Sequence, residues 1–295
     1  MIWGQFVGDA AALGTHWIYE LDELAAAFPR VQGFERPQAG HYHEGKSPGD
    51  QTHYGDAALL LLESVAEMGR FAAADYARRF VAFFGNEATV TYRDHATQDT
   101  LAHLSAEPGN LLNGADDNQP ATITRMAPVV AVHGSDSAVI EALTRFSQNN
   151  AQAVGYCQAN ARILSALLEG AALPMAFGQA EYEEATADVT QAEAARELGV
   201  NEATQRFGQS CPLPKSFPSA VHTALRHGDD FRAAILAAIG AGGDNAARCS
   251  VLGAWLGAAG GLAAVPADWR EKLTARERIQ SALDRLSLRL RTAGS

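Results

Sequence analysis

The amino-acid sequence predicts an all-α protein folded as a single compact multi-helix domain over residues 1–295. Apolar residues recur at helical spacing along almost the whole chain, as they do in amphipathic and buried helices. No segment shows the sustained alternation of β-branched residues that is typical of strands. Of the 295 residues, 47% are apolar and 19% are charged, which indicates a globular chain with a large core. No repeat or compositional shift marks a domain boundary.

The helical periodicity defines the expected elements in chain order. We expect helices over residues 2–13, 19–28, 52–69, 73–85, 92–104, 121–133, 136–147, 150–170, 179–198, 217–227, 229–240, 245–261 and 268–291. Ser137, which follows Gly134, begins one of these helices, and Pro108 with Gly109 marks a break before a polar loop.

Two stretches are expected to be irregular. Residues 29–51 contain seven Gly or Pro residues around the sequence H-Y-H at 41–43, and a loop of this length in a compact domain usually carries a site. Residues 207–218 contain three prolines and are expected to form a connector.

Charge and cysteine content limit the partners and the compartment. The net charge of −11 argues against nucleic acid and against an anionic membrane surface, because both require a basic footprint. The three cysteines are widely spaced and lack a C-x-x-C pair, so we interpret them as reduced thiols. No Lys or Arg precedes Arg30, so a signal peptide is not expected and the chain is predicted to be cytoplasmic. The sequence carries no signal for an oligomeric state.

One uncharged stretch, Cys249 to Ala267, has about the length of a membrane span. Its Gly253, Gly257 and Gly261 put a bare strip on one helical face, and small residues of this kind let a neighbouring helix approach closely. We therefore expect a buried helix of a bundle.

Two carboxylates lie where a glycine turn leads into an apolar helix. Asp50 occurs in S-P-G-D-Q-T, and Asp244 occurs in G-A-G-G-D-N. Each is expected to cap its helix by accepting a backbone N–H. Together, two such helix N-termini would offer oxygen ligands to a hard cation and N–H donors to a phosphate. A divalent ion with a diphosphate would fit this arrangement.

The N-terminal segment is punctuated by glycine as well. Gly4 and Gly8 lie one helical turn apart, which predicts tight helix packing, and Asp9 falls on an apolar face. A lone carboxylate in that position needs a partner. Both a structural ion pair and a functional role remain open for Asp9.

These segments, in this order, resemble the ADP-ribosylglycohydrolase superfamily. Its helix motif G-x-x-x-G-D-A-x-G appears here as G-Q-F-V-G-D-A-A-A-L-G, its T-D-D-T as G-D-Q-T, and its G-G-D-x-D-T as G-G-D-N-A-A. The resemblance spans nearly the whole chain and implies the all-α fold of that family. The variant motifs, with H-W-I-Y-E at 16–20, are more similar to the J-type crystallin branch than to the hydrolases of the family.

The resemblance implies a metal site of altered composition. In the family, the two motifs hold two magnesium ions that contact the ribose. Here Asp50 and Asp244 are kept, whereas four other ligand positions are occupied by Gly49, Gln51, Ala246 and Ala247. Two magnesium ions need about six oxygens each, so we expect one Mg²⁺ ion or none, with Asp50 and Asp244 as the metal ligands.

The expected function is that of a divergent hydrolase acting on an N- or O-glycosidic bond of ADP-ribose or a related ribosyl compound. The substrate would be a small-molecule or protein-linked ADP-ribosyl group. Glu20 and Asp50 are the expected catalytic residues, because cleavage of a glycosidic bond needs protonation or water activation. Arg248 is expected to neutralise Asp244 or Asp50. The expected substrate-binding residues are Asp9, His16, Gly49, Gln51, Asn149, Gly243, Asn245 and Arg248.

Two alternatives remain open at this point. The loss of four family ligands is compatible with a non-catalytic protein that binds a ligand or serves as an abundant crystallin-like structural protein. In the other alternative, His41, His43 and His53 would form a mononuclear zinc or iron site with an Asp. Whether the chain is an enzyme is therefore left undecided.

Overall fold

The computed structural model describes residues 1–88 and 92–293, and these residues form an all-α fold. Two isolated bridges pair Ile18 with Gly243 and Ala115 with Gln148. The described residues contain no strand beyond these two bridges. The elements are α1 (Ile2–Ala12), η1 (Leu13–Thr15), α2 (Leu21–Ala27), α3 (His53–Met68), α4 (Ala73–Phe84), α5 (His95–Ala106), η2 (Ile123–Arg125), α6 (Ala127–His133), α7 (Ser137–Ser147), α8 (Ala151–Leu168), α9 (Leu173–Phe177), α10 (Glu183–Ala194), α11 (Val200–Phe207), α12 (Leu213–His227), α13 (Phe231–Gly240), α14 (Asn245–Ala259), α15 (Gly261–Ala264), α16 (Ala267–Glu271) and α17 (Arg276–Ala293).

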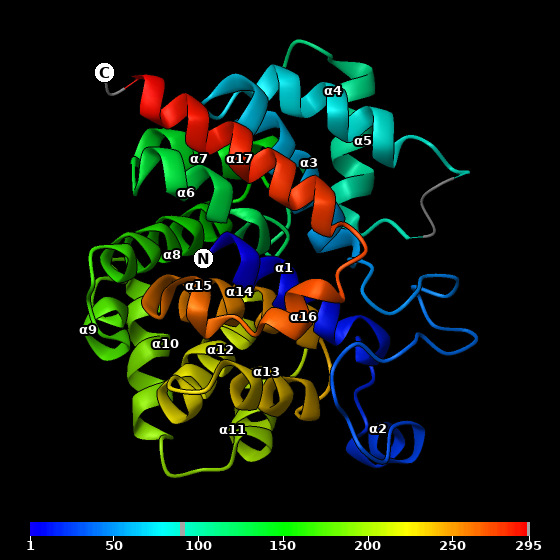
Figure 1. Cartoon of the computed structure of the whole chain (residues 1–295), viewed down its shortest axis with the longest axis vertical. Helices are drawn as coiled ribbons and strands as arrows, with labels where there is room; N and C mark the ends of the chain where they lie inside the picture. Colours follow the sequence, from blue (N-terminus) through cyan, green and yellow to red (C-terminus); the bar gives the residue numbers. More distant parts are fainter. Residues whose placement is uncertain (89–91, 294–295) are drawn as a thin grey trace.

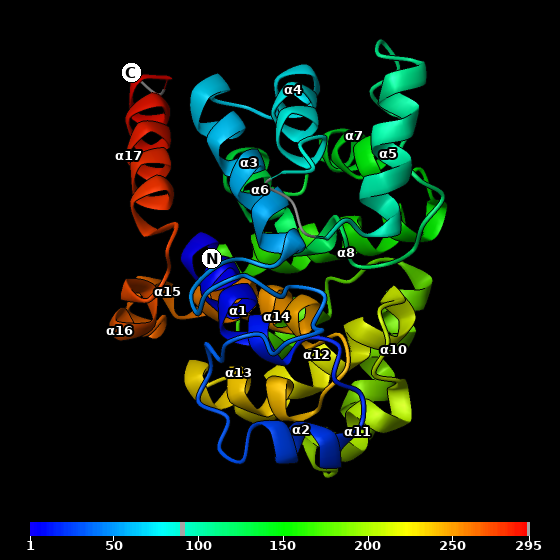
Figure 2. The same cartoon turned by 90° about the vertical axis from the view of Figure 1, so that its right-hand side faces the viewer.

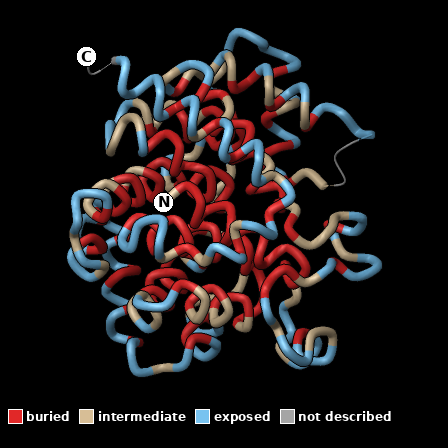
Figure 3. The backbone as a smooth tube through the Cα atoms, viewed as in Figure 1, coloured by how far each residue is buried: buried red, intermediate tan, exposed pale blue. Residues whose placement is uncertain are grey.

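Helices α1 and α14 form the centre of the molecule, with the other helices around them (Figure 1, Figure 2). A Cβ atom on Gly4 would lie 2.0 Å from the Gly253 carbonyl oxygen, and one on Gly8 would lie 2.0 Å from that of Cys249. Gly4 and Gly8 therefore let the backbones of α1 and α14 come into contact, as their spacing predicts. Gly261 of the predicted strip lies beyond the end of α14, and nothing lies within 4 Å of its Cβ position. One continuous apolar core surrounds this pair, and exposed residues gather at the periphery (Figure 3).

Helix α14 is buried from Asn245 to Ala258, as expected for the first part of the uncharged stretch Cys249 to Ala267. The prediction of a buried helix over that whole stretch is wrong, because α14 ends at Ala259 and residues 259–263 are exposed. None of the helices that the structure describes combines the length and apolarity needed to cross a membrane. The three cysteines, Cys157, Cys211 and Cys249, are free, in agreement with the prediction.

Prolines explain two differences from the expected elements. The predicted connector 207–218 is wrong in its second half, because α12 begins at Leu213 and contains Pro218. Pro214 lies in the first turn of α12, where the missing N–H is not needed, whereas Pro218 lies inside the helix and removes one backbone hydrogen bond. The predicted helix 121–133 is divided into η2 and α6 at Met126. Pro128, in the first turn of α6, has no N–H to donate to the carbonyl oxygen of Thr124, four residues earlier. The hydroxyl of Ser250 instead donates to the Thr124 carbonyl oxygen at 2.9 Å.

Other differences concern short or divided helices. The predicted helix 268–291 consists of α16 and α17, and the prediction for 179–198 is too long, since α10 ends at Ala194. Helices α9 and α11 are absent from the expected elements, because five and eight residues are too few for a clear period. Helix α17 lies across α3, where Arg278 and Arg285 pair with Glu63 and Glu67.

Candidate functional site

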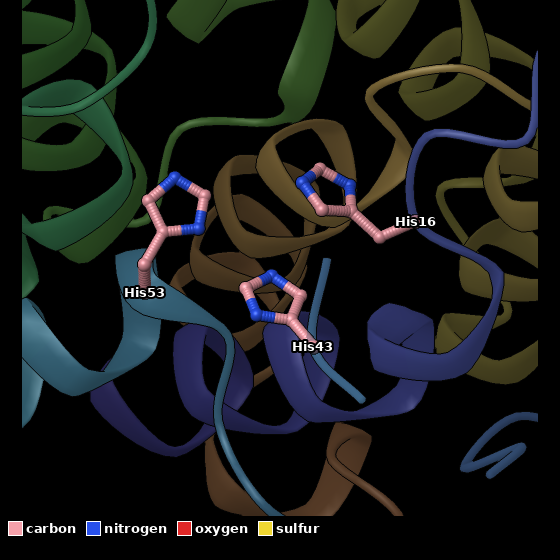
Figure 4. A group of neighbouring side chains, drawn as sticks. All are labelled: His16, His43 and His53. Carbon is pink, nitrogen blue, oxygen red and sulfur yellow. The ribbon is translucent and has the colours of Figure 1, made fainter. Parts of the chain in front are cut away.

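Three buried histidines from three separate segments meet beside the N-terminus of α3. His16 follows η1, His43 lies in the long loop that precedes α3, and His53 is the first residue of α3. Their potential ligand nitrogens all lie within 4.8 Å of one another. Figure 4 shows one nitrogen of each ring directed into the space between the rings. We call His16, His43 and His53 the histidine cluster.

Carboxylates lie on the outer side of two of these rings. Nδ1 of His16 lies 3.5 Å from Oδ1 of Asp244. Nε2 of His53 lies 3.5 Å from Oδ2 of Asp94. Both carboxylates are buried. Each carboxylate therefore faces one nitrogen of its histidine and leaves the other nitrogen directed toward the cluster.

His41 lies outside the cluster, which corrects the predicted set His41, His43 and His53. Its Nδ1 accepts the backbone N–H of His43 at 3.0 Å, and its Nε2 lies 2.7 Å from the carbonyl oxygen of His16. Both ring nitrogens are thus occupied by backbone groups. His41 therefore connects the backbones of His16 and His43. In the cluster, His16 occupies the position that the sequence analysis assigned to His41.

Aromatic side chains cover the histidine cluster. The ring centroid of Trp17 lies 3.9 Å from that of His16 and 5.4 Å from that of His53. Trp17 also contacts Tyr42 and Tyr92 edge to face. Its backbone adopts a left-handed φ of 63°, which is uncommon for a bulky residue and characteristic of functional sites. The hydrogen bond from its N–H to the Gly243 carbonyl oxygen, 2.8 Å long, helps to hold this conformation.

Buried hydrogen bonds connect the three sequence motifs pairwise. Asp9 of the first motif accepts the N–H and the hydroxyl of Thr52, at 2.7 and 2.5 Å. The hydroxyl of Tyr54, two residues later, donates to Asp244 at 3.1 Å. The amide of Asn245 in the third motif donates to the Thr15 carbonyl and hydroxyl oxygens. The motifs therefore converge on one buried polar centre.

Burial controls the electrostatics around Asp244. It raises the pKa of this carboxyl, and the nearby Arg248 guanidinium opposes the shift. Burial and then the neighbouring histidines lower the pKa of His16 well below its usual value. Burial and Asp244 together raise the pKa of Tyr54, which stays protonated and donates.

Asp9 and Gln51 form a second buried polar pair, on either side of the space left by Gly55. Burial raises the pKa of Asp9 to about 6, although the hydrogen bonds from Thr52 oppose this. Gln51 is buried, and neither side-chain polar atom has a hydrogen-bond partner within the described residues. A Cβ on Gly55 would lie 2.2 Å from Oε1 of Gln51 and 2.3 Å from Oδ2 of Asp9. Glycine at position 55 therefore makes room for both polar groups.

Asp50 does not cap α3, which corrects one prediction. The cap is Thr52, whose hydroxyl accepts the N–H of Tyr54. The carboxylate of Asp50 instead accepts the N–H of Ser47 at 2.7 Å and the hydroxyl of Thr274 at 2.6 Å. Among the described residues it shares no hydrogen-bond partner with Asp244, which caps α14 as predicted by accepting the N–H of Ala247.

The other predicted site residues have varied surroundings. Gly49 is pressed against the backbone of Lys272, since a Cβ atom at position 49 would lie 2.0 Å from the Lys272 carbonyl oxygen. Glu20 is exposed at the start of α2. Asn149 is exposed; its side-chain oxygen accepts a hydrogen bond from Arg145, and its amide donates one to Asn113. Gly243 pairs with Ile18 in a bridge between the first and third motifs.

Arg248 is buried at the first turn of α14. Its guanidinium donates to the carbonyl oxygens of Gln209 and Gly242, and its charge opposes the raised pKa of Asp244. The predicted neutralisation of Asp244 is therefore in keeping with its position, whereas Asp50 has other partners.

A surface groove of about 670 Å³ opens beside the histidine cluster. Tyr42, Tyr92 and Arg93 line one part of it, and helices α4 and α5 supply other walls. The ring of Tyr92 lies 5.1 Å from that of His53. Tyr92 therefore lines the groove and also contacts the histidine cluster.

Sequence reasoning did not identify Asp94, Tyr54, Trp17 or Tyr92. Asp94 caps α5 by accepting the N–H of Thr97. Burial would raise its pKa, but interactions with His53 and Thr97 hold the pKa at about 2. The sequence Y-R-D-H at 92–95 reads as an ordinary helix start, so no signal there pointed to a site.

Comparison with known proteins gives a consistent picture. The chain matches the ADP-ribosylglycohydrolase family over residues 1–295. It is 24% identical to crystallin J1A of Tripedalia cystophora, with 96% of this chain and 94% of the crystallin covered. Crystallin J1B of the same organism is 23% identical, with 90% and 88% covered.

The fold agrees with these matches. A solved structure described as an ADP-ribosylglycohydrolase-related protein complex superposes with a TM-score of 0.70 at 22% identity, over 97% of this chain and 96% of that one. The sequence match extends over every residue of the chain, and the all-α architecture is shared. The chain therefore belongs to the ADP-ribosylglycohydrolase family.

Proposed function

We propose that the chain is a divergent hydrolase that cleaves an N- or O-glycosidic bond of ADP-ribose or a related ribosyl compound. The observation that carries this proposal is the convergence of the three family motifs. Asp9 with Thr52, Tyr54 with Asp244, and Asn245 with Thr15 connect them through buried hydrogen bonds. These hydrogen bonds bring polar residues from three distant segments together in one buried centre, which supports a common active site.

Asp244 is the carboxylate that we assign to proton transfer. It is buried, and burial raises its pKa above the usual value of a carboxyl group, a direction that favours proton donation. The catalytic roles predicted for Glu20 and Asp50 stay predictions. Glu20 is exposed, and the carboxylate of Asp50 is held by Ser47 and Thr274, outside the hydrogen bonds that connect the three motifs.

The groove is the proposed binding place for the adenosine diphosphate half of the substrate. Its volume of about 670 Å³ falls in the range of small-molecule sites. Tyr42 and Tyr92 offer ring faces for an adenine, and Arg93 offers positive charge for phosphates. The ribose would then point toward Trp17, which must move aside to expose the centre beneath it.

The residues present do not fit the pair of magnesium ions that the family implies. Magnesium requires oxygen ligands in octahedral geometry. The two retained carboxylates, Asp50 and Asp244, bond to different protein groups, and the centre is dominated by imidazole nitrogens. We therefore derive no catalytic step from magnesium.

The proposal is tested by incubating the purified chain with ADP-ribose linked through N- and O-glycosidic bonds and measuring ADP-ribose release by chromatography. We expect release from at least one linkage, and tighter ADP-ribose binding by the wild type than by Tyr92→Ala or Arg93→Ala. Arg285→Ala, which alters an exposed arginine paired with Glu67, is the matched control. Absence of release from every linkage would contradict the hydrolase proposal, whether or not ADP-ribose binds.

The crystallin relatives favour a second candidate, a non-catalytic protein that retains the fold. Two crystallins match at least 90% of this chain. In this case ADP-ribose would bind without turnover, or would not bind at all. The same release and binding measurements distinguish the two candidates.

A further inference from the structure

The geometry points to a mononuclear transition-metal site, of the kind that binds zinc, formed by Nε2 of His16, Nε2 of His43 and Nδ1 of His53. Three residues from distant segments bring their nitrogens within 4.8 Å of one another, and all three side chains are buried. In Figure 4 the three rings surround a common point. The inference concerns metal binding alone and holds independently of the proposed hydrolase activity.

The ring nitrogens provide the first argument. Nε2 of His16 and both nitrogens of His43 and of His53 are buried and make no hydrogen bond within the described residues. Buried polar atoms are nearly always satisfied, and an unpaired one costs free energy. Three neighbouring imidazoles directed at one point are satisfied together by a single cation.

The second argument comes from the outer side of the rings. Histidine ligands usually present their other nitrogen to a carboxylate or a carbonyl, which fixes the ring orientation. Asp244 lies 3.5 Å from Nδ1 of His16, and Asp94 lies 3.5 Å from Nε2 of His53. The carboxylates thus select which nitrogen of His16 and of His53 faces the cluster, whereas neither nitrogen of His43 has a partner among the described residues.

The backbone supports the same geometry. Nδ1 of His41 accepts the N–H of His43, and its Nε2 contacts the carbonyl oxygen of His16. His53 is held by its place at the start of α3, directly after the cap residue Thr52. The positions of all three ligands are therefore fixed by groups that do not bind the metal.

The ligand set determines the class of metal. Imidazole suits zinc, copper, nickel and iron, whereas magnesium and calcium prefer oxygen. Three protein ligands leave one coordination position free, as in catalytic zinc sites and unlike closed structural ones. Trp17 lies over the rings of His16 and His53.

The test uses the full chain, stripped with a chelator and titrated separately with Zn²⁺ and Co²⁺ in the absence of any nucleotide. Bound metal is measured by mass spectrometry after desalting, and the Co²⁺ form by its absorption spectrum. We expect one ion per chain, cobalt bands of a nitrogen-ligated site of low coordination number, and no competition from an approximately 1000-fold excess of magnesium.

Variants locate the ion. His43→Gln and His53→Gln are expected to weaken zinc binding by at least about 100-fold, and Asp94→Asn by about 10-fold, with circular dichroism as the check on folding. His227→Gln, at the end of α12, is the control and should bind as the wild type does. If a ligand variant fails to fold, the cobalt spectrum of the wild type and the affinity of Asp94→Asn decide. No retained metal, a thiolate charge-transfer band, or unchanged affinity in folded His43→Gln would overturn the inference.

Discussion

Oδ1 of Asp244 and Nδ1 of His16 lie 3.5 Å apart, both buried, although 228 positions separate them in the chain. Asp244 also caps α14 and accepts the hydroxyl of Tyr54. One carboxylate therefore connects the third motif to the first motif segment and to α3. It orients His16 within the histidine cluster and is the group to which we assign proton transfer.

Replacing Asp244 with Asn should separate its charge from its capping role. Asparagine caps a helix about as well as aspartate, so the fold should be retained. We expect the loss of ADP-ribose release and a decrease of about 10-fold in zinc affinity, because His16 loses its carboxylate partner. Asp136→Asn, at the exposed cap of α7, is the control in both assays. Wild-type release of ADP-ribose by Asp244→Asn would contradict its role in proton transfer, and wild-type zinc affinity would contradict its role in orienting His16.

Replacing Gly8 with Ala should destabilise the centre of the fold. The added Cβ would lie 2.0 Å from the Cys249 carbonyl oxygen, so α1 and α14 must separate, at a cost of about 2–4 kcal/mol. Gly240→Ala is the matched helical control. Nothing lies within 4 Å of its Cβ position, and alanine there should stabilise the protein by about 0.5 kcal/mol. Urea denaturation measures the free energy of unfolding of both variants. Equal changes in the two variants would show that α1 and α14 do not pack this closely.

The carboxyl of Asp188 should make stability depend on pH. Burial raises its pKa from 3.8 to about 6, although the hydrogen bond from the Tyr156 hydroxyl opposes this. Between these two values the native state binds more protons than the unfolded chain, so stability falls as pH rises from about 4 through 6. Asp188→Asn mimics the protonated form. It should match the wild type near pH 4 and be about 1–3 kcal/mol more stable at pH 7.5. Urea denaturation at both pH values checks this, and an equal difference at both would contradict it.

Trp17 should control access to the histidine cluster. Its ring covers the imidazoles, and its φ of 63° suits glycine better than tryptophan. In Trp17→Gly we expect a chelator to extract zinc about tenfold faster or more, with a smaller change in affinity, because a cover limits exchange more than binding. Trp17→Phe retains an aromatic cover and should exchange as the wild type does. Equal extraction rates in all three proteins would show that Trp17 does not gate the site.

The sequence predicted those features that depend on local patterns or on the family motifs. The close helix packing expected at Gly4, Gly8 and Gly253 occurs between α1 and α14, and Asp244 caps its helix. Asp50 differs because Gly49, with its left-handed φ of 92°, directs the chain toward Thr274, a residue far away in sequence. The place of His16 rather than His41 in the cluster depends on the path of a long irregular loop, which has no periodicity to interpret.

The most direct test of the histidine cluster is anomalous diffraction at the zinc absorption edge, recorded from crystals of the chain soaked in zinc. The account predicts one dominant anomalous peak, about 2.0–2.1 Å from a nitrogen each of His16, His43 and His53. It also predicts that the outer nitrogens of His16 and His53 remain directed at Asp244 and Asp94. A crystal with zinc bound only elsewhere, at Cys211 or at surface carboxylates, would contradict it.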